Sequence, residues 1–159
     1  MKSILITGST GKIGQAIVKH CLKMGYFTIL PVRDIDKTKS LFQADNDKIL
    51  FIKSDFFNEQ SIQDIVFEIN HIELKPETLL FCARSTDTLE IELDGSVSSE
   101  NFQKEFYMDV VFPYRLIIDL KKITANIQNI IFISSIYGVV APNPSLYEDF
   151  KMSSPINYG

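Results

Sequence analysis

The chain has 159 residues, of which 45% are hydrophobic and 23% are charged, the proportions of a globular protein of about one domain. Its formal net charge is −4 and its 16 Lys and Arg are scattered, which argues against nucleic acid as a partner. The opening apolar run is too short for a signal peptide and none reaches the roughly 18 residues of a membrane helix, so we expect a cytoplasmic protein without membrane association.

In chain order, short β-branched runs alternate with segments of helical period. The predicted elements are a strand at about 3–7, a helix at 12–24, a strand at 27–32, a weak helix at 36–43, a strand at 49–53, a helix at 59–70, a strand at 78–83, a loop at 84–98, a long helix at 99–122 and a strand at 129–134. The strands are continuously apolar, which is typical of a parallel sheet covered by helices on both faces.

Three of the helices show an apolar stripe. In the helix at 59–70 the stripe comprises Ile62, Ile65, Val66 and Ile69. In the first helix the stripe comprises Ile13, Ala16, Ile17, Cys21 and Met24. In the long helix it comprises Phe102, Phe106, Val110, Tyr114 and Ile117. Pro113 lies inside the long helix and is expected to kink or break it.

A glycine-rich turn joins the first strand to the first helix. Its residues are Gly8, Ser9, Thr10, Gly11, Lys12, Ile13 and Gly14. Glycines at such a turn permit φ > 0, close approach of a pyrophosphate and tight helix–sheet packing, and the helix N-terminus attracts phosphate. A Walker-type loop needs four residues between its glycines, whereas two intervene here. The turn therefore predicts a dinucleotide site in a doubly wound, Rossmann-type α/β domain, with an ordinary turn as the alternative.

The end of the second strand bears on the choice between NAD and NADP. An arginine there accepts the 2′-phosphate of NADP, and an acid binds the ribose hydroxyls of NAD. The sequence has Arg33 followed by Asp34, so both cofactors stay open, with Arg33 giving NADP the preference. A solvated charge pair is the alternative.

Along its whole length the chain resembles the short-chain dehydrogenase/reductase family. Its glycine turn, Thr7 to Gly14, is similar to the cofactor turn of that family, and Asp55 follows the third strand where the family has an Asp that bonds adenine. The resemblance implies that Asp55 and Phe56 contact the cofactor, together with Cys82, Ala83 and Arg84. These last residues belong to the segment 81–84, which lies where many members carry Asn-Asn-Ala-Gly, and only Ala83 matches.

The resemblance also implies catalytic residues. The segment 132–138 is similar to the strand that delivers the catalytic serine, here Ser135, with Ser134 as the fallback. Tyr158 then corresponds to the tyrosine of the Y-x-x-x-K motif, the general acid/base of the family. Asp109 takes the place of an active-site Asn, and a carboxylate cannot donate a hydrogen bond unless it is protonated.

The lysine of that motif would lie three residues past Gly159. The last strands of the family's sheet would also lie beyond this residue. We therefore expect residues 1–159 to form a single, C-terminally incomplete nucleotide-binding domain that is inactive or nearly so, even where its parent is an NAD(P)-dependent oxidoreductase.

Partners and rival functions complete the predictions. We expect a small-molecule substrate, reduced thiols at Cys21 and Cys82, no metal site, and a homo-oligomer for the full-length parent through the long helix. Similarity of the segment 134–142 to enzymes of bacterial surface-sugar and flagellin-glycan biosynthesis suggests a sugar or sugar-nucleotide substrate. The alternatives are a non-catalytic nucleotide-binding module and an inactive gene fragment with a bare sheet edge.

Overall fold

A computed structural model describes residues 1–42, 47–94 and 96–140 of the chain. Its five strands are β1 (Ser3–Ile6), β2 (Phe27–Val32), β3 (Ile49–Lys53), β4 (Thr78–Phe81) and β5 (Asn129–Phe132). Its α-helices are α1 (Lys12–Lys23), α2 (Ile35–Leu41), α3 (Gln60–His71), α4 (Ser99–Phe106) and α5 (Phe112–Ile123). A π-helix, η1 (Tyr107–Val111), joins α4 to α5, and a short 3₁₀-helix, η2 (Ile136–Gly138), follows β5.

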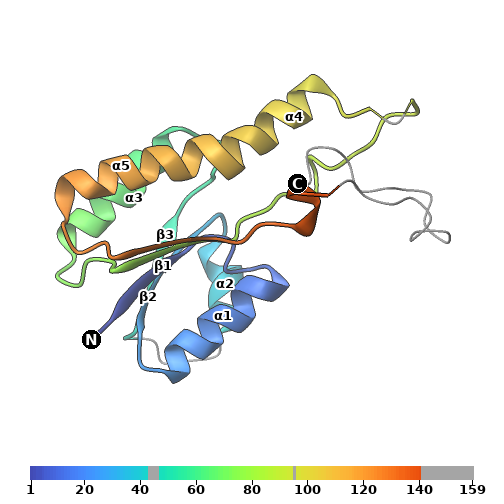
Figure 1. Cartoon of the computed structure of the whole chain (residues 1–159). Coiled ribbons are helices and arrows are strands. Elements are labelled where there is room, and N and C mark those ends of the chain that lie inside the picture. The colour runs from blue at the N-terminus through green and yellow to red at the C-terminus, as the bar shows by residue number, and fades with distance from the viewer. Residues whose placement is uncertain (43–46, 95, 141–159) are drawn as a thin grey trace.

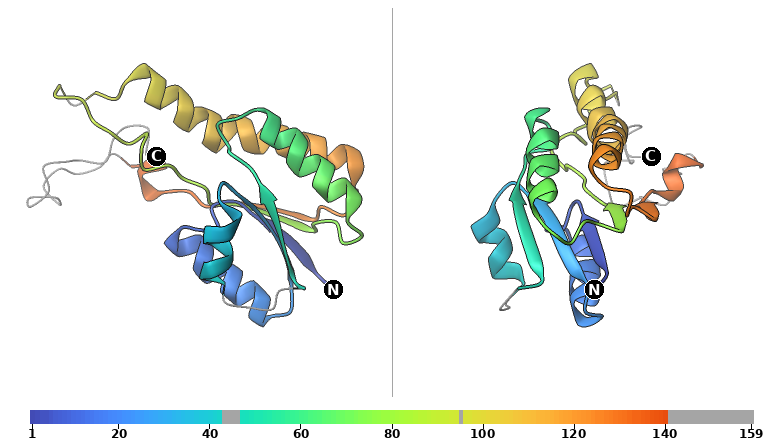
Figure 2. Two further views of the ribbon diagram at one scale, coloured as in Figure 1. Left: turned by 180° about the vertical axis from the view of Figure 1, so that it is seen from behind. Right: turned by 90° about the vertical axis from the view of Figure 1, so that its left-hand side faces the viewer.

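The strands form one parallel sheet in the order β3-β2-β1-β4-β5. Leu5 at the centre of β1 pairs with Ile29 of β2 and with Leu79 of β4. Helices α1 and α2 cover one face of the sheet, while α3, α4 and α5 lie on the other (Figure 1). The views in Figure 2 show the same two layers from behind and from the side. The predicted doubly wound Rossmann-type fold is therefore confirmed.

Each face of the sheet has its own hydrophobic core. On the side of α3 and α5, Leu5, Ile29 and Leu79 pack with apolar residues of the two helices. On the side of α1 and α2, Ile4 and Leu30 pack with Val18 of α1 and their neighbours. Apolar side chains alternate between the two faces, which explains why these strands read as continuous apolar runs.

Strand β5 differs from the other strands. All four of its residues are exposed, so the expectation that every strand is covered on both faces was wrong for this one. Phe132 of β5 nevertheless stacks on Phe81 of β4, with ring centroids 5.0 Å apart. Three strands, β1, β4 and β5, also end one or two residues earlier than predicted. At the ends of β1 and β4, the Thr7 hydroxyl accepts hydrogen bonds from the N–H groups of Cys82 and Ala83.

The predicted apolar face of α3 is confirmed, with Ile62, Ile65 and Ile69 buried, whereas those of α1 and the long helix needed correction. In α1 the buried residues are Gly14 and Val18. Of the predicted stripe, Ile17 and Cys21 pack partly buried against the core, whereas Ile13 and Met24 are 57% and 63% exposed. In the long helix the buried residues are Glu105, Met108, Phe112, Pro113, Leu116 and Leu120. The predicted apolar stripe lies outside this face: Phe102, Phe106, Val110 and Tyr114 are exposed, and Ile117 is partly buried.

Pro113 lies in the first turn of α5, directly after the π-helix. The predicted break is therefore confirmed, since proline is tolerated at a helix start, where its missing N–H is not needed. Residues 84–94 and 96–98 form the predicted loop. Among the described residues, no helix has both the length and the apolar character that crossing a bilayer requires.

Candidate functional site

Two adjoining cavities open at the carboxyl ends of the strands, near the boundary between β1 and β4 where the strand order reverses. The larger, of about 350 Å³, is lined by Ser135 and Asp109 among others. The smaller, of about 80 Å³, is lined by Ser9 and Arg33 among others. Ala83, Arg84 and Met108 line both. Open α/β sheets bind ligands at this topological switch point.

The glycines of the turn have different structural roles. Gly8 has a φ of +69°, and a Cβ there would lie 2.4 Å from the carbonyl oxygen of Cys82. A Cβ on Gly14 would lie 2.1 Å from the Gly8 carbonyl oxygen. Gly11, by contrast, is exposed, and a Cβ there would meet only that oxygen, at 3.4 Å. Gly8 and Gly14 are therefore required by the packing of the protein itself, whereas Gly11 leaves its outer side open.

The turn has the features of an anion site. Helix α1 begins after Gly11 with no side-chain cap, so the first N–H groups of the helix are not used by a capping side chain. The Ser9 hydroxyl lining the smaller cavity is buried and has no hydrogen-bond partner among the described residues. Thr10 lines the same cavity and Lys12 is exposed at the helix start. These features fit a dinucleotide whose pyrophosphate lies at the N-terminus of α1.

Arg33 and Asp34 are separated by the fold. Arg33 lines the smaller cavity beside the glycine turn. The Asp34 carboxylate accepts a hydrogen bond of 2.9 Å from the backbone N–H of Lys37 and so caps α2. The opposing signals of this pair in the sequence therefore have a structural explanation, since Asp34 serves as a helix cap.

Asp55 and Phe56 also line the smaller cavity. Asp55 is exposed, and its carboxylate accepts a hydrogen bond from the Phe57 N–H, which holds the turn after β3. The Phe56 ring packs on that of Phe112, with centroids 4.7 Å apart, so this side chain belongs largely to the core.

Thr7 joins the two halves of the sheet. Its buried hydroxyl accepts hydrogen bonds from the N–H groups of Cys82 and Ala83, at 3.1 and 3.3 Å. Cys82 and Ala83 thereby sit against the larger cavity, and partial burial raises the pKa of the Cys82 thiol. A neutral thiol is the expected form of this residue.

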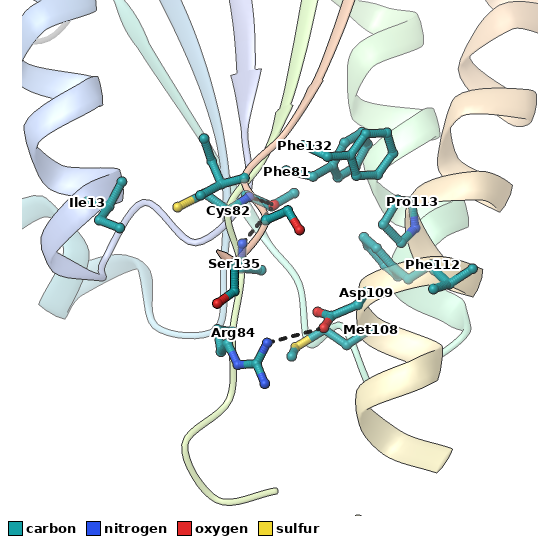
Figure 3. Close-up of a pocket in the computed structure, with 15 residues that line it drawn as sticks. Ile13, Phe81, Cys82, Arg84, Met108, Asp109, Phe112, Pro113, Phe132 and Ser135 are labelled. Carbon is teal, nitrogen blue, oxygen red and sulfur yellow. Dashed lines mark hydrogen bonds and ion pairs between the residues drawn. The ribbon is translucent and has the colours of Figure 1, made fainter. Parts of the chain in front are cut away.

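Ser135 and Asp109 lie on opposite walls of the larger cavity (Figure 3). Ser135 follows β5, and its Oγ accepts a hydrogen bond from the Tyr137 N–H, which starts the 3₁₀-helix. The Ser134 fallback lines the cavity too, as does Ile13 from α1. Tyr158 lies outside the described residues, and its catalytic role stays a prediction.

Asp109 belongs to a charged cluster that the sequence did not reveal. Arg84 forms ion pairs with both Glu105 and Asp109, at 3.3 and 3.5 Å. Burial and the neighbouring Glu105 raise the pKa of Asp109 to about 6, against the opposing effect of Arg84. The Thr88 hydroxyl donates a hydrogen bond to Glu105. Glu105 precedes Asp109 by four residues, a helical neighbour spacing that could have suggested the pair.

The chain belongs to the short-chain dehydrogenase family, whose model, described as "short chain dehydrogenase", matches residues 2–148. No curated protein matches the sequence significantly.

Solved structures share the fold. A short-chain dehydrogenase from Streptomyces avermitilis is 20% identical, with a TM-score of 0.77 over 89% of this chain and 52% of its own. One from Leptospira borgpetersenii with bound NAD+ is 22% identical, with a TM-score of 0.76 over 99% and 58% of the two chains. L-sorbose reductase from Gluconobacter frateurii, in complex with NADPH and L-sorbose, is 22% identical, with a TM-score of 0.75 over 99% and 57%. The chain thus spans between half and three-fifths of the length of these proteins.

Proposed function

We propose that this protein is the nucleotide-binding domain of an NAD(P)-dependent oxidoreductase acting on a hydroxyl or carbonyl group of a small molecule. The observation that carries the proposal is the pair of adjoining cavities. One opens on the glycine turn and the other on Ser135, and they meet at Ala83, Arg84 and Met108. A dinucleotide is a ligand long enough to occupy both, with its two ends on either side of β1 and β4.

The nucleotide would be held by the turn and by the residues around the smaller cavity. Gly11, Ser9 and the N-terminus of α1 would receive the pyrophosphate, and Asp55 would face the adenosine end. A bound nicotinamide would supply the redox chemistry of the reaction.

The chain's own residues would act on the substrate oxygen. The Ser135 Oγ accepts from the Tyr137 N–H, which leaves its own proton free to be donated to the substrate oxygen as negative charge develops there. Tyr158 is proposed to give or take the proton on that oxygen, on the strength of the family motif.

We propose NADP as the preferred cofactor. Arg33 lines the smaller cavity, and a guanidinium is well suited to bind a 2′-phosphate by paired hydrogen bonds. Asp34, which would oppose NADP, has its carboxylate committed to the cap of α2. The structural neighbours include one with bound NAD+ and one with NADPH, so the neighbours themselves do not favour either cofactor.

The substrate class and assembly are part of the same proposal. A sugar or sugar-nucleotide derivative is the class indicated by the segment 134–142.

A homodimer through the long helix is supported by the exposed apolar stripe of Phe102, Phe106, Val110 and Tyr114. Sedimentation equilibrium should show dimers of the parent protein, and Phe106→Glu should shift them to monomers.

A second candidate is a nucleotide-binding module without catalysis. It is favoured by Asp109, whose carboxyl group is engaged by Arg84 rather than free in the cavity. Substrate-dependent oxidation or reduction of the bound nucleotide would separate an enzyme from such a module.

The direct test is calorimetric titration of NADP+ into the wild-type chain and into Gly11→Val. A valine here should remove measurable binding by occupying the phosphate position, because Gly11 has little else in contact. Ala16→Val is the matched control, since Ala16 is exposed on the same helix and gains the same side chain. Unchanged binding by Gly11→Val would contradict the proposed site.

A further inference from the structure

A charged cluster borders the larger cavity, into which it places Arg84 and Asp109. It joins the loop after β4, through Arg84 and Thr88, to the long helix, through Glu105 and Asp109. The Glu105 side chain is only 2% exposed. Its Oε1 accepts from the Thr88 hydroxyl, and its Oε2 lies 3.3 Å from Nη2 of Arg84. Figure 3 shows Arg84 and Asp109 facing each other across the mouth of the cavity.

The charges in this cluster do not balance if both carboxyl groups are ionised. Among the described residues, the charged groups that act on Asp109 are Glu105 on α4 and Arg84 on the loop. One guanidinium neutralises one carboxylate, and the second carboxylate would then remain as an excess negative charge in a partly desolvated place, since 36% of the Asp109 side chain is exposed. Two neighbouring carboxylates in such a site commonly retain a proton between them.

The hydrogen bonding points to the position of that proton. Within the described part of the chain, no donor is hydrogen-bonded to Oε2 of Glu105, although this atom is buried. Asp109 lies four residues further along the helix, in the π-helical turn Tyr107–Val111, and its carboxyl group shares the Arg84 guanidinium with Glu105. Two carboxyl groups can form a hydrogen bond with each other only when one of them carries a proton.

We propose that, in weakly acidic solution, the Arg84-bound Glu105 carboxylate holds Asp109 as a neutral carboxylic acid, so that Arg84, Glu105 and Asp109 together carry no net charge. Asp109 donates its proton to Glu105 and accepts from Arg84 Nη1. Glu105 and Arg84 are thus positioning residues that act through Asp109.

The consequence for chemistry rests on the proposed function. In the reduction of a carbonyl group, negative charge develops on the substrate oxygen beside Ser135. A neutral Asp109 on the opposite wall leaves that charge undisturbed, whereas an ionised Asp109 opposes it. Because the pKa of Asp109 is raised to about 6, the neutral form loses its proton as the pH rises through that value.

The test is ¹³C NMR titration of the side-chain carboxyl groups of the 159-residue chain, with Asp109→Asn used to assign the Asp109 resonance. We expect the Asp109 midpoint near pH 6 in the wild type and at least one pH unit lower in Glu105→Gln. That substitution keeps an acceptor for Thr88 but removes the charge. A wild-type midpoint near 4 would overturn the proposal, and so would an unchanged midpoint in a folded Glu105→Gln variant. If that variant does not fold, the wild-type midpoint decides.

A second test is kinetic. The value of kcat/KM for carbonyl reduction should fall above about pH 6 in the wild type, and Asp109→Asn should lack this limb because its amide stays neutral. A limb unchanged in Asp109→Asn contradicts the inference. Failure of the proposed function, seen as absent nucleotide binding, is distinguishable because the NMR titration needs no nucleotide.

Discussion

The two halves of the sheet, which meet between β1 and β4, line their cavities with different kinds of groups. In the half formed by β1, β2 and α1, glycines and backbone groups form the proposed phosphate site, beside the side chains of Arg33 and Asp55. Strand residues such as Leu5 and Ile29 are fully buried there. In the half formed by β4, β5 and the long helix, side chains such as Arg84, Asp109 and Ser135 line the cavity, and β5 is exposed.

The glycine turn is required by the fold, whereas the side chains around the larger cavity are specific to this protein's site. A backbone-built phosphate site depends on steric requirements that few residues satisfy, so it is visible as a glycine pattern. A site built from side chains depends on pairings between distant segments, here the loop after β4 and the long helix. The four predictions below test this contrast, beginning with the largest expected effect.

Gly14→Val should abolish cooperative folding, with a loss of at least about 4 kcal/mol in the free energy of unfolding. The physical reason is that a Cβ at this position would lie 2.1 Å from the Gly8 carbonyl oxygen, which is backbone and cannot move aside. Urea denaturation followed by circular dichroism measures the effect. Gly11→Val should stay within about 1 kcal/mol of the wild type, and equal losses in the two variants would remove the distinction between the glycines.

Arg33→Gln should weaken NADP+ binding about tenfold to a hundredfold, the equivalent of about 1.5–3 kcal/mol for hydrogen bonds to a charged group. NAD+ binding should change little, because NAD+ has no 2′-phosphate. Calorimetry with both nucleotides checks the difference. Equal weakening for NAD+ and NADP+ would show that Arg33 does not discriminate between them.

Thr7→Val tests the joint between the two halves. The valine keeps the shape of threonine but leaves the N–H groups of Cys82 and Ala83 without their acceptor. We expect a loss of about 1–3 kcal/mol in the free energy of unfolding. Thr86→Val, at an exposed position in the following loop, is the control and should be nearly neutral. A neutral Thr7→Val would show that these hydrogen bonds do not stabilise the joint.

Asp109→Asn should raise the melting temperature at pH 8 by about 2–4 °C. Since the pKa of Asp109 is raised by folding, its contribution to stability is fully present below pH 3.8 and is lost as the pH rises through about 6. The variant does not ionise, so its advantage over the wild type should grow between pH 4 and pH 7. Differential scanning calorimetry across this range would contradict the sign if the advantage shrank instead.

The same contrast explains what could be predicted from the sequence. Strand positions and the doubly wound fold followed from local patterns and the family resemblance. The predicted site residues Ser9, Arg33, Asp55 and Ser135 line the two cavities.

Other features depend on tertiary structure and were missed. The long helix carries two apolar rows, and periodicity alone gave Phe102 to Tyr114 without revealing that the row through Phe112 and Leu116 is the buried one. Glu105 would ordinarily be assigned to the solvent-exposed face of a helix. Its burial depends on Arg84 and Thr88, which come from a loop with no periodic signal.

The central claim is that one dinucleotide occupies both cavities, and a crystal structure of the chain with NADP+ tests it most directly. The account predicts the pyrophosphate at the N-terminus of α1 beside Gly11, the 2′-phosphate on Arg33, and the nicotinamide in the cavity lined by Ser135. A nucleotide bound elsewhere, or one whose phosphates lie away from the glycine turn, would contradict the account.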